Sequence, residues 1–266
     1  MNFPNRIICL TEETTEILYE LGAEDLIVGI SGYTVRPKRA RKEKPRVSAF
    51  SSAKIDKIIE LKPDLVLGFS DIQSDICSEL IKNGINVLCF NQRSVEEILN
   101  VINLLGRIIN QADKAENYVK KIKIKLDQIS RSSNKLQVRP KVYFEEWNDP
   151  LITGIKWVSE LIEIAGGIDI FKNKSFEPLA LNRIIKNPST IVKENPDIII
   201  GSWCGKKLKK EEITFRDGWD KINAVQNDQV YEIKSPLILQ PGPAALTDGL
   251  DEIFKIILKW ENFITS

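Results

Sequence analysis

Histidine is absent from this chain of 266 residues, and the only methionine is Met1. Without imidazole the chain lacks the commonest general base at neutral pH and the commonest metal ligand. Without an internal methionine it also lacks a usual axial ligand of haem. The composition therefore argues against acid–base catalysis, and it predicts no catalytic residue, no metal centre and no required cofactor.

Cysteine is scarce, and its four copies show no framework spacing: Cys9, Cys77, Cys89 and Cys204. We interpret them as reduced thiols in a reducing compartment. The first strand pattern begins within ten residues, with no basic and apolar leader before it. This predicts a cytoplasmic protein, and the alternative is a periplasmic protein from which a leader has been removed.

Charge of one sign is not in excess, because 38 lysines and arginines face 37 aspartates and glutamates. No global field therefore recruits nucleic acid or a membrane surface. Apolar runs such as Leu65–Leu67 are far too short to cross a bilayer, so we expect no membrane insertion. Basic residues do gather from Arg36 to Arg46, where a phosphate-bearing ligand, an acidic partner or a solvated surface would each account for them.

What the chain does contain is an internal repeat. The segment ELKPDLVLGFS from Glu60 to Ser70 returns as ENPDIIIGSW from Glu194 to Trp203. Each copy has the pattern of a helix end, a proline that stops the helix, a buried strand and a glycine turn with an aromatic residue. A second pair, EILYELGAEDL from Glu16 and ELIEIAGGIDI from Glu160, aligns without gaps. Two copies in the same order predict two similar lobes, and a cleft between α/β lobes is a usual place for a small ligand.

Strand patterns alternate with helical patterns in both halves, which predicts an α/β fold of two doubly wound lobes with parallel sheets. The expected strands are 7–10, 27–30, 65–67, 87–90, 141–144, 198–200 and 230–233. The expected helices are 13–21, 55–61, 75–83, 95–110, 157–165, 188–194 and 246–263.

Between the halves, apolar residues spaced three and four apart from Ala112 to Ile129 predict one long helix. We therefore divide the chain into an N-terminal lobe (1–111), a linker helix (112–136) and a C-terminal lobe (137–266). A single stiff helix between two lobes would allow only small hinge motion.

An ordered series of segments resembles the substrate-binding proteins of ABC importers for cobalamin and iron chelates, the class III periplasmic binding proteins with a helical backbone. The resemblance is greatest to the cobalamin-binding subgroup. It is carried by RIICLTEETTE from Arg6, VGISGY from Val28, PRVS from Pro45, KIDKI from Lys54, LKPDLV from Leu61, DPLITG from Asp149, AGG from Ala165 with Phe171, and PDII from Pro196. It implies non-catalytic binding of a small organic ligand, a corrinoid such as cobalamin or a metal chelate, between two lobes joined by a helix.

Members of that family dock to a transporter permease through one acidic residue on each lobe. The first position falls near Asp75, whereas the second aligns near Ser189, which carries no charge. A monomer that docks to a permease is one expectation. The alternative is a cytoplasmic ligand-binding accessory protein, or an enzyme, that uses the same fold without docking.

The loops at the strand ends supply the candidate ligand-binding residues, because open α/β sheets bind ligands outside the carboxyl ends of their strands. In the first lobe these are Thr11, Glu12, Glu13, Ser31, Tyr33, Phe50, Ser51, Phe69, Ser70, Asp71, Gln92 and Arg93. In the second they are Glu145, Glu146, Trp147, Trp157, Ser202, Trp203 and Ser235.

Each candidate has a purely structural alternative. Thr11, Ser31 and Ser51 are also typical helix N-caps, and a helix dipole alone would favour Glu12 and Glu13 in a first turn. Adjacent carboxylates at Glu145 and Glu146 would face either a solvated turn or a ligand rich in donors. The aromatic candidates would offer flat apolar surface to a macrocycle, although Trp157 would equally suit a core.

Overall fold

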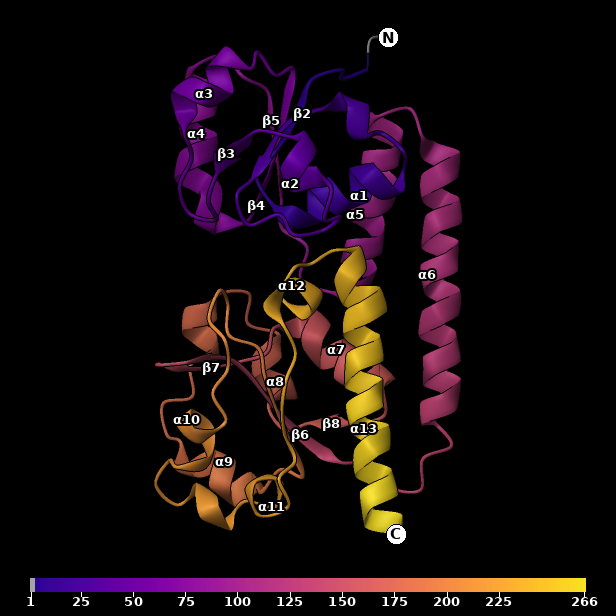
Figure 1. Ribbon diagram of the computed structural model, residues 1–266, viewed down its shortest axis with the longest axis vertical. Coiled ribbons are helices and arrows are strands. Elements are labelled where there is room, and N and C mark those ends of the chain that lie inside the picture. Colours follow the sequence, from indigo (N-terminus) through magenta and orange to yellow (C-terminus); the bar gives the residue numbers. More distant parts are fainter. Residues whose placement is uncertain (1–2) are drawn as a thin grey trace. The chain divides into compact units, whose positions relative to one another are not determined.

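The computed structural model describes residues 3–266, and its contacts divide the chain into two compact units (Figure 1). Unit 1 holds the residues up to Gln92 together with Glu96–Lys121. Unit 2 holds Arg93–Val95 together with Ile122–Ser266. The helix α6 (Ala112–Ser133) therefore begins in unit 1 and ends in unit 2. Our division of the chain into an N-terminal lobe, a linker helix and a C-terminal lobe stays a prediction.

Unit 1 is built on a five-stranded parallel sheet with the strand order β3-β2-β1-β4-β5. Its elements are β1 (Ile7–Cys9), α1 (Glu12–Glu20), η1 (Glu24–Leu26), β2 (Ile27–Ser31), α2 (Ala40–Glu43), β3 (Arg46–Ser48), α3 (Ile55–Glu60), β4 (Leu65–Phe69), η2 (Asp71–Gln73), α4 (Ser74–Lys82), β5 (Val87–Phe90) and most of α5 (Val95–Ile108).

The side chains of each strand alternate between the two faces of this sheet, and helices cover both faces. Ile8 and Val66 point to one face, where they pack with Ile58 of α3 and Leu80 of α4. In Figure 1, α3 and α4 lie on one side of these strands and α1 lies on the other. The four strands predicted for this half are confirmed. β3 was missed because Val47 is its only buried apolar residue, whereas the equally short β1 is buried and apolar throughout.

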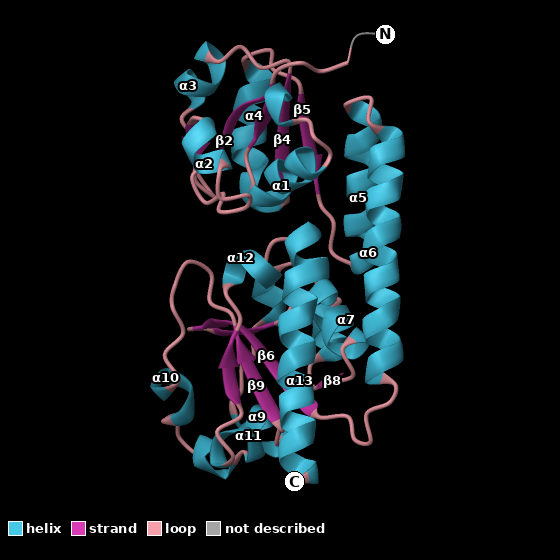
Figure 2. Ribbon diagram, turned by 45° about the vertical axis from the view of Figure 1, so that its right-hand side comes forward, coloured by secondary structure: helices cyan, strands magenta, loops and turns pink. Residues whose placement is uncertain are grey.

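Unit 2 contains a second sheet with the strand order β10-β9-β6-β7, and β8 also pairs with β6. Figure 2 shows its strands β6 and β9 beside the closing helix. Its elements are β6 (Lys141–Asn148), β7 (Leu151–Thr153), α7 (Lys156–Ile164), β8 (Ile168–Asp169), α8 (Lys172–Ser175), η3 (Ala180–Arg183), α9 (Ser189–Glu194), β9 (Ile198–Gly201), α10 (Glu211–Thr214), η4 (Trp219–Lys221), α11 (Asn223–Gln226), β10 (Val230–Glu232), α12 (Ser235–Ile238), η5 (Ala245–Gly249) and α13 (Leu250–Thr265).

Three expectations for unit 2 were wrong in detail. β6 does not end at Phe144 but continues to Asn148, because its second half pairs with the antiparallel strand β7. β7 and β8 were missed, since neither contains a run of buried apolar residues. The closing helix opens with a π-helical segment at Ala245–Gly249 and becomes α-helical only at Leu250. The predicted fold class, mixed α/β with two largely parallel sheets, is confirmed.

The internal repeat is also a structural repeat. Gly22 after α1 and Gly166 after α7 both have a positive φ, of 67° and 95°. In both copies the glycine N–H donates to the carbonyl three residues back, and the next N–H donates to the carbonyl five residues back. This pattern ends a helix with a left-handed residue, for which glycine is suited because it lacks a Cβ.

The aspartate of each proline–aspartate pair in the repeat has the same structural role in its own sheet. The carboxylate of Asp64 accepts the N–H of Arg6 at 3.1 Å, just before β1. The carboxylate of Asp197 accepts the N–H of Lys141 at 2.9 Å, at the start of β6. Each aspartate therefore aligns its own strand with the neighbouring central strand of its unit.

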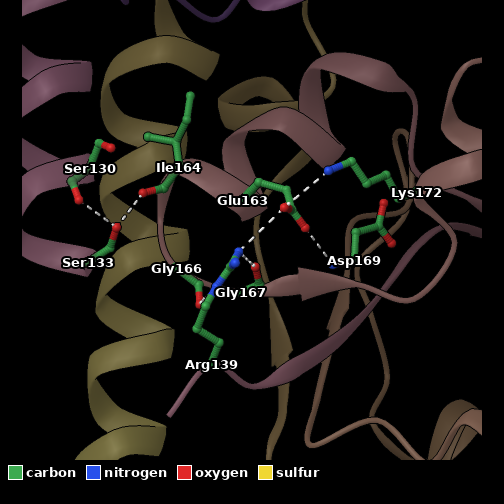
Figure 3. Close-up of polar contacts among 9 residues, drawn as sticks. All are labelled: Ser130, Ser133, Arg139, Glu163, Ile164, Gly166, Gly167, Asp169 and Lys172. Atoms are coloured by element: carbon green, nitrogen blue, oxygen red, sulfur yellow. Dashed lines mark hydrogen bonds and ion pairs between the residues drawn. The ribbon is translucent and has the colours of Figure 1, made fainter. Parts of the chain in front are cut away.

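The end of α6 is held to the other elements of unit 2 by a small polar cluster (Figure 3). Ser133 donates its hydroxyl to the carbonyl of Ile164 at 2.8 Å. Arg139, in the segment that follows α6, donates to the carbonyls of Gly166 at 3.2 Å and Gly167 at 2.6 Å. A Cβ at Gly166 would lie 2.9 Å from the Cβ of Ser133, so the close approach requires glycine.

Candidate functional site

The carboxyl ends of all five strands of unit 1 meet at one edge of its sheet, since every pairing in that sheet is parallel. The twelve candidates of the first lobe lie at or just after these strand ends, although Arg93 belongs to unit 2 by its contacts. The structure thus brings the residues from Thr11 to Gln92 to a shared edge. Whether they bind a ligand stays a prediction.

Most candidates of unit 1 are buried rather than open. Thr11, Ser31, Phe69, Ser70 and Gln92 are each at most 5% exposed, whereas Tyr33 is 55% exposed and Ser51 and Asp71 are exposed. Of the aromatic candidates in this unit, Tyr33 therefore offers the largest accessible ring surface.

Glu12 and Glu13 lie in the first turn of α1, as predicted, and are 3% and 1% exposed. Burial raises the pKa of Glu12 to about 8 and that of Glu13 to about 7. The Val35 N–H donates to Glu12 at 3.2 Å and the Thr11 hydroxyl donates to Glu13 at 2.6 Å, and both bonds oppose the rise in pKa. Oε2 of Glu13 has no hydrogen-bond partner among residues 3–266.

Ser70 stands at the end of β4 with φ 59° and ψ 179°, a conformation that residues with a side chain rarely adopt. Its N–H donates to the carbonyl of Phe90 at 2.7 Å, and its hydroxyl accepts the N–H of Ile72 at 3.3 Å. Such strained residues persist only where their surroundings hold them, and they gather at ligand sites.

Gln73, which the sequence did not single out, connects three of these strand ends. Its amide nitrogen donates to the carbonyls of Leu10 at 3.2 Å and Phe50 at 3.0 Å. Its amide oxygen accepts the N–H of Phe69 at 3.0 Å. The side chain is fully buried, so it links the loops that follow β1 and β3 to the last residue of β4 without facing a ligand itself. Nothing in the sequence marks this position, because a glutamine after a strand end has many possible partners.

In unit 2 the adjacent carboxylates of β6 point to different arginines. Arg216 binds Glu145, and the Trp203 indole N–H and the Tyr143 hydroxyl also donate to Glu145 at 3.1 and 3.2 Å. Nη2 of Arg183 lies 2.9 and 2.7 Å from the two oxygens of Glu146. The expectation that these carboxylates lie in a strand-end loop was wrong, because β6 continues through them.

Burial raises the pKa of Glu146, while the charge of Arg183 acts against the rise. Arg183 is itself only 2% exposed, and its Nε donates to the carbonyl of Thr153 at 3.2 Å. The pair joins β6 to β7 and the η3 segment. Both glutamates therefore already have strong partners inside unit 2, and neither is an open carboxylate.

The remaining candidates of unit 2 vary in exposure. Trp157 and Trp203 are 3% and 2% exposed, and the Trp157 indole N–H donates to the carbonyl of Ile238 at 2.9 Å. Trp147 is half-buried against the core, and Ser235 begins α12 and is half-buried. Ser202, at the end of β9, is fully buried, and its hydroxyl has no partner among residues 3–266.

No group of three or more Cys, Asp or Glu side chains within residues 3–266 is arranged to hold a metal ion. The polar groups at the strand ends are hydroxyls, amides and carboxyls, which suit hydrogen bonding to an organic ligand. In the same part of the chain, no helix is both long and apolar enough to span a bilayer.

Comparison with known proteins adds independent findings. The family described as periplasmic binding protein matches residues 7–237. An uncharacterized ABC transporter substrate-binding lipoprotein of Bacillus subtilis is 30% identical over 263 residues, which cover 96% of this chain and 80% of the relative. A vitamin B12-binding protein of Vibrio cholerae is 26% identical over 259 residues, covering 94% of this chain and 88% of the relative.

Solved structures are similar over nearly the whole chain. A possible iron-binding (periplasmic solute-binding) protein of Staphylococcus epidermidis superposes with a TM-score of 0.80 at 26% identity, covering 96% of this chain and 99% of that one. The periplasmic vitamin B12-binding protein of Vibrio cholerae superposes with a TM-score of 0.77 at 22% identity, covering 97% and 98%. The second likeness concerns the fold alone.

Proposed function

Because the chain belongs to the periplasmic binding protein family, we propose that it is the substrate-binding component of an ABC importer. It binds a small organic ligand and releases it unchanged. The single observation that carries this proposal is the family match over residues 7–237, supported by a substrate-binding lipoprotein that is 30% identical over 96% of the chain. The composition agrees, since a chain without histidine is poorly equipped for acid–base catalysis.

The proposed ligand is a corrinoid such as cobalamin, and a metal chelate is the second choice. Relatives named for vitamin B12 binding, together with a structural neighbour named as a possible iron-binding protein, support this order. Such ligands are large and partly flat, and they are bound by apolar contact plus a few placed polar groups. With no histidine available, a bound corrinoid or haem has no imidazole ligand from this chain.

The contacts are proposed to come from the strand-end loops of the two units. In unit 1, Tyr33 offers an exposed ring and Ser51 and Asp71 offer exposed polar groups. In unit 2, Trp147 and Ser235 are half-buried beside the ends of β6 and β10. The buried ion pairs of Glu145 and Glu146 shape these loops and do not supply free carboxylates.

The proposal places the protein outside the cytoplasm, as a monomer that docks to a permease. The relatives named as a lipoprotein and as periplasmic proteins favour this location over the cytoplasmic one. Asp75, exposed in the first turn of α4, is the proposed docking acid of unit 1. Asp75→Asn should lower the rate of ligand uptake through the permease and leave the ligand Kd unchanged.

Calorimetric titration of the full chain with cyanocobalamin, haemin and a ferric siderophore tests the proposal. One of these ligands should bind with a 1:1 stoichiometry and be recovered chemically unchanged by mass spectrometry. Tyr33→Ala should weaken that binding at least about tenfold, since it removes a stacking ring. Phe215→Ala is the matched control, because Phe215 is 83% exposed in unit 2 and stands at no strand end.

The second candidate function is a cytoplasmic accessory protein or enzyme that keeps the fold without docking. One observation favours it: Ser189 at the start of α9 carries no charge where the family resemblance expects a docking acid. Conversion of any of the three ligands during incubation would support this candidate and overturn the importer proposal.

A further inference from the structure

A basic pocket lies beside β3, the edge strand of the unit 1 sheet. The cavity measures about 620 Å³, and its lining includes five cationic side chains and no aspartate or glutamate. The cations are Arg41, Lys44, Arg46, Lys54 and Lys57. A volume of this size is in the range of small-molecule sites.

Three elements supply the five cations. Arg41 comes from α2, Lys44 and Arg46 flank the start of β3, and Lys54 and Lys57 belong to the beginning of α3. Hydrogen bonds within unit 1 hold this backbone in place. The Pro45 carbonyl accepts the N–H of Ile30 at 2.9 Å, and the Val47 carbonyl accepts the N–H of Lys54 at 2.8 Å. The positive charges therefore converge from ordered segments rather than from a flexible tail.

Neighbouring arginines are neutralised by carboxylates, but these cations are not. Arg36 pairs with Glu16 at 2.8 Å, and Arg39 pairs with Glu24 at 2.6 Å. Within residues 3–266, the five pocket cations form no ion pair with a carboxylate within 4 Å, although Lys44 lies in the field of Glu24. Like charges that share one cavity repel each other, and a bound anion would relieve that repulsion.

We propose that this pocket binds a small polyanion with at least two phosphate or carboxylate groups. Arginine presents a planar fork to such groups, and lysine presents a compact charge, so a set of both suits an anion with several oxygens. The polar lining favours a hydrophilic ligand. The pocket borders the loops that carry Tyr33 and Ser51, because Gly32 and Ser52 line it, but none of the proposed corrinoid contacts belongs to its lining. The inference does not rest on the proposed function.

Calorimetry of the full chain with pyrophosphate, and in parallel with citrate, tests the proposal without any corrinoid present. The informative variant is the triple change Arg41→Gln, Arg46→Gln and Lys54→Gln, since all three side chains are exposed and their loss should leave the fold intact. Wild-type protein should bind at least one of the two anions, and the triple variant should bind it more than about tenfold more weakly.

The matched control removes the same charge elsewhere in unit 1, by Lys82→Gln, Lys120→Gln and Lys121→Gln at exposed helical positions outside the pocket. It should keep the wild-type affinity to within about twofold, which corresponds to only a few tenths of a kcal/mol. Equal losses in both variants, or no binding of either anion by the wild-type protein, would overturn the site. Binding to vesicles of anionic lipid, without binding to free pyrophosphate or citrate, would also overturn it.

Discussion

The guanidinium of Arg216 binds both carboxylate oxygens of Glu145, with Nη1 at 2.5 Å from Oε2 and Nη2 at 2.9 Å from Oε1. Glu145 is fully buried on β6, and the Arg216 side chain is 18% exposed. The arginine also lies over the Trp219 ring, 4.5 Å from its centroid. This contact ties the segment after α10 to the central strand of the unit 2 sheet.

Replacing Glu145 with glutamine should destabilise unit 2 by about 3 kcal/mol, because removal of one partner of a buried pair leaves the other charge uncompensated. Urea titration followed by tryptophan fluorescence measures this change. All five tryptophans of the chain lie in unit 2, so the signal reports on that unit: Trp147, Trp157, Trp203, Trp219 and Trp260.

Glu252→Gln is the control for this experiment. Glu252 pairs with Lys255 on the surface of α13 at 2.7 Å, and exposed pairs of this kind contribute little to stability. Its urea midpoint should equal that of the wild-type protein. An equal midpoint for Glu145→Gln as well would show that the Arg216 contact does not stabilise the fold.

The pKa values of Glu12 and Glu13 predict that unit 1 loses stability as the pH rises. Burial sets these pKa values at about 8 and about 7, above the ordinary value near 4.5. The folded state then holds protons that the unfolded chain releases, so the stabilisation is complete below about pH 4.5 and disappears as the pH passes 7 to 8. Hydrogen exchange of β1 and α1 amides should therefore show weaker protection at pH 8 than at pH 5.5, after correction for intrinsic exchange.

The double variant Glu12→Gln and Glu13→Gln should remove most of this pH dependence. Charges that remain close by are Glu16 and its partner Arg36. Glu20→Gln is the matched control, since Glu20 ends the same helix in an exposed position, and its profile should follow the wild type. A double variant with the wild-type pH dependence would assign the effect to other groups.

The regular elements could be predicted because their signals are local. The buried run Ile198–Ile200 and the proline–aspartate pair before it mark β9 from the sequence alone. β7 and β8 lack a run of buried apolar side chains, unlike the equally short β1, so the sequence did not mark them. The partners of the candidate carboxylates were beyond prediction, since Arg216 lies 71 residues from Glu145 and Arg183 lies 37 residues from Glu146. A pair of adjacent glutamates indicates that partners are needed, but it does not say which ones.

The contact between α5 and α6 depends on a missing side chain at Gly106. A Cβ at this position would lie only 2.2 Å from the Cβ of Ala115. Gly106→Ala gains about 1 kcal/mol of helix propensity but forces the helices apart, and overpacking costs about 1 to 3 kcal/mol. We expect a lower melting temperature by circular dichroism. Asn100→Ala, at an exposed position of α5, should not lower it, and a stabilised Gly106→Ala would contradict the close approach.

Arg139 gives the last prediction, because its two bonds to the carbonyls of Gly166 and Gly167 require a planar fork (Figure 3). Glu163 completes the cluster by pairing with Arg139 at 3.4 Å and with Lys172 at 3.2 Å. Lysine keeps the charge, but its single ammonium nitrogen cannot reproduce the two bonds that Arg139 makes from two separate nitrogens, Nε and Nη2. Arg139→Lys should therefore speed hydrogen exchange in the segment from Gly166 to Asp169.

The control for Arg139→Lys is Arg131→Lys, since Arg131 is 79% exposed on α6 and contacts only Asp127 of the same helix among the ion pairs of residues 3–266. Its exchange rates should match the wild type, because an exposed pair within a helix contributes little. Unchanged rates in both variants would mean that Gly166 and its left-handed φ hold the turn without help from Arg139. Faster exchange in Arg139→Lys alone would show that the guanidinium fork holds the turn after α7, at the junction with the end of α6.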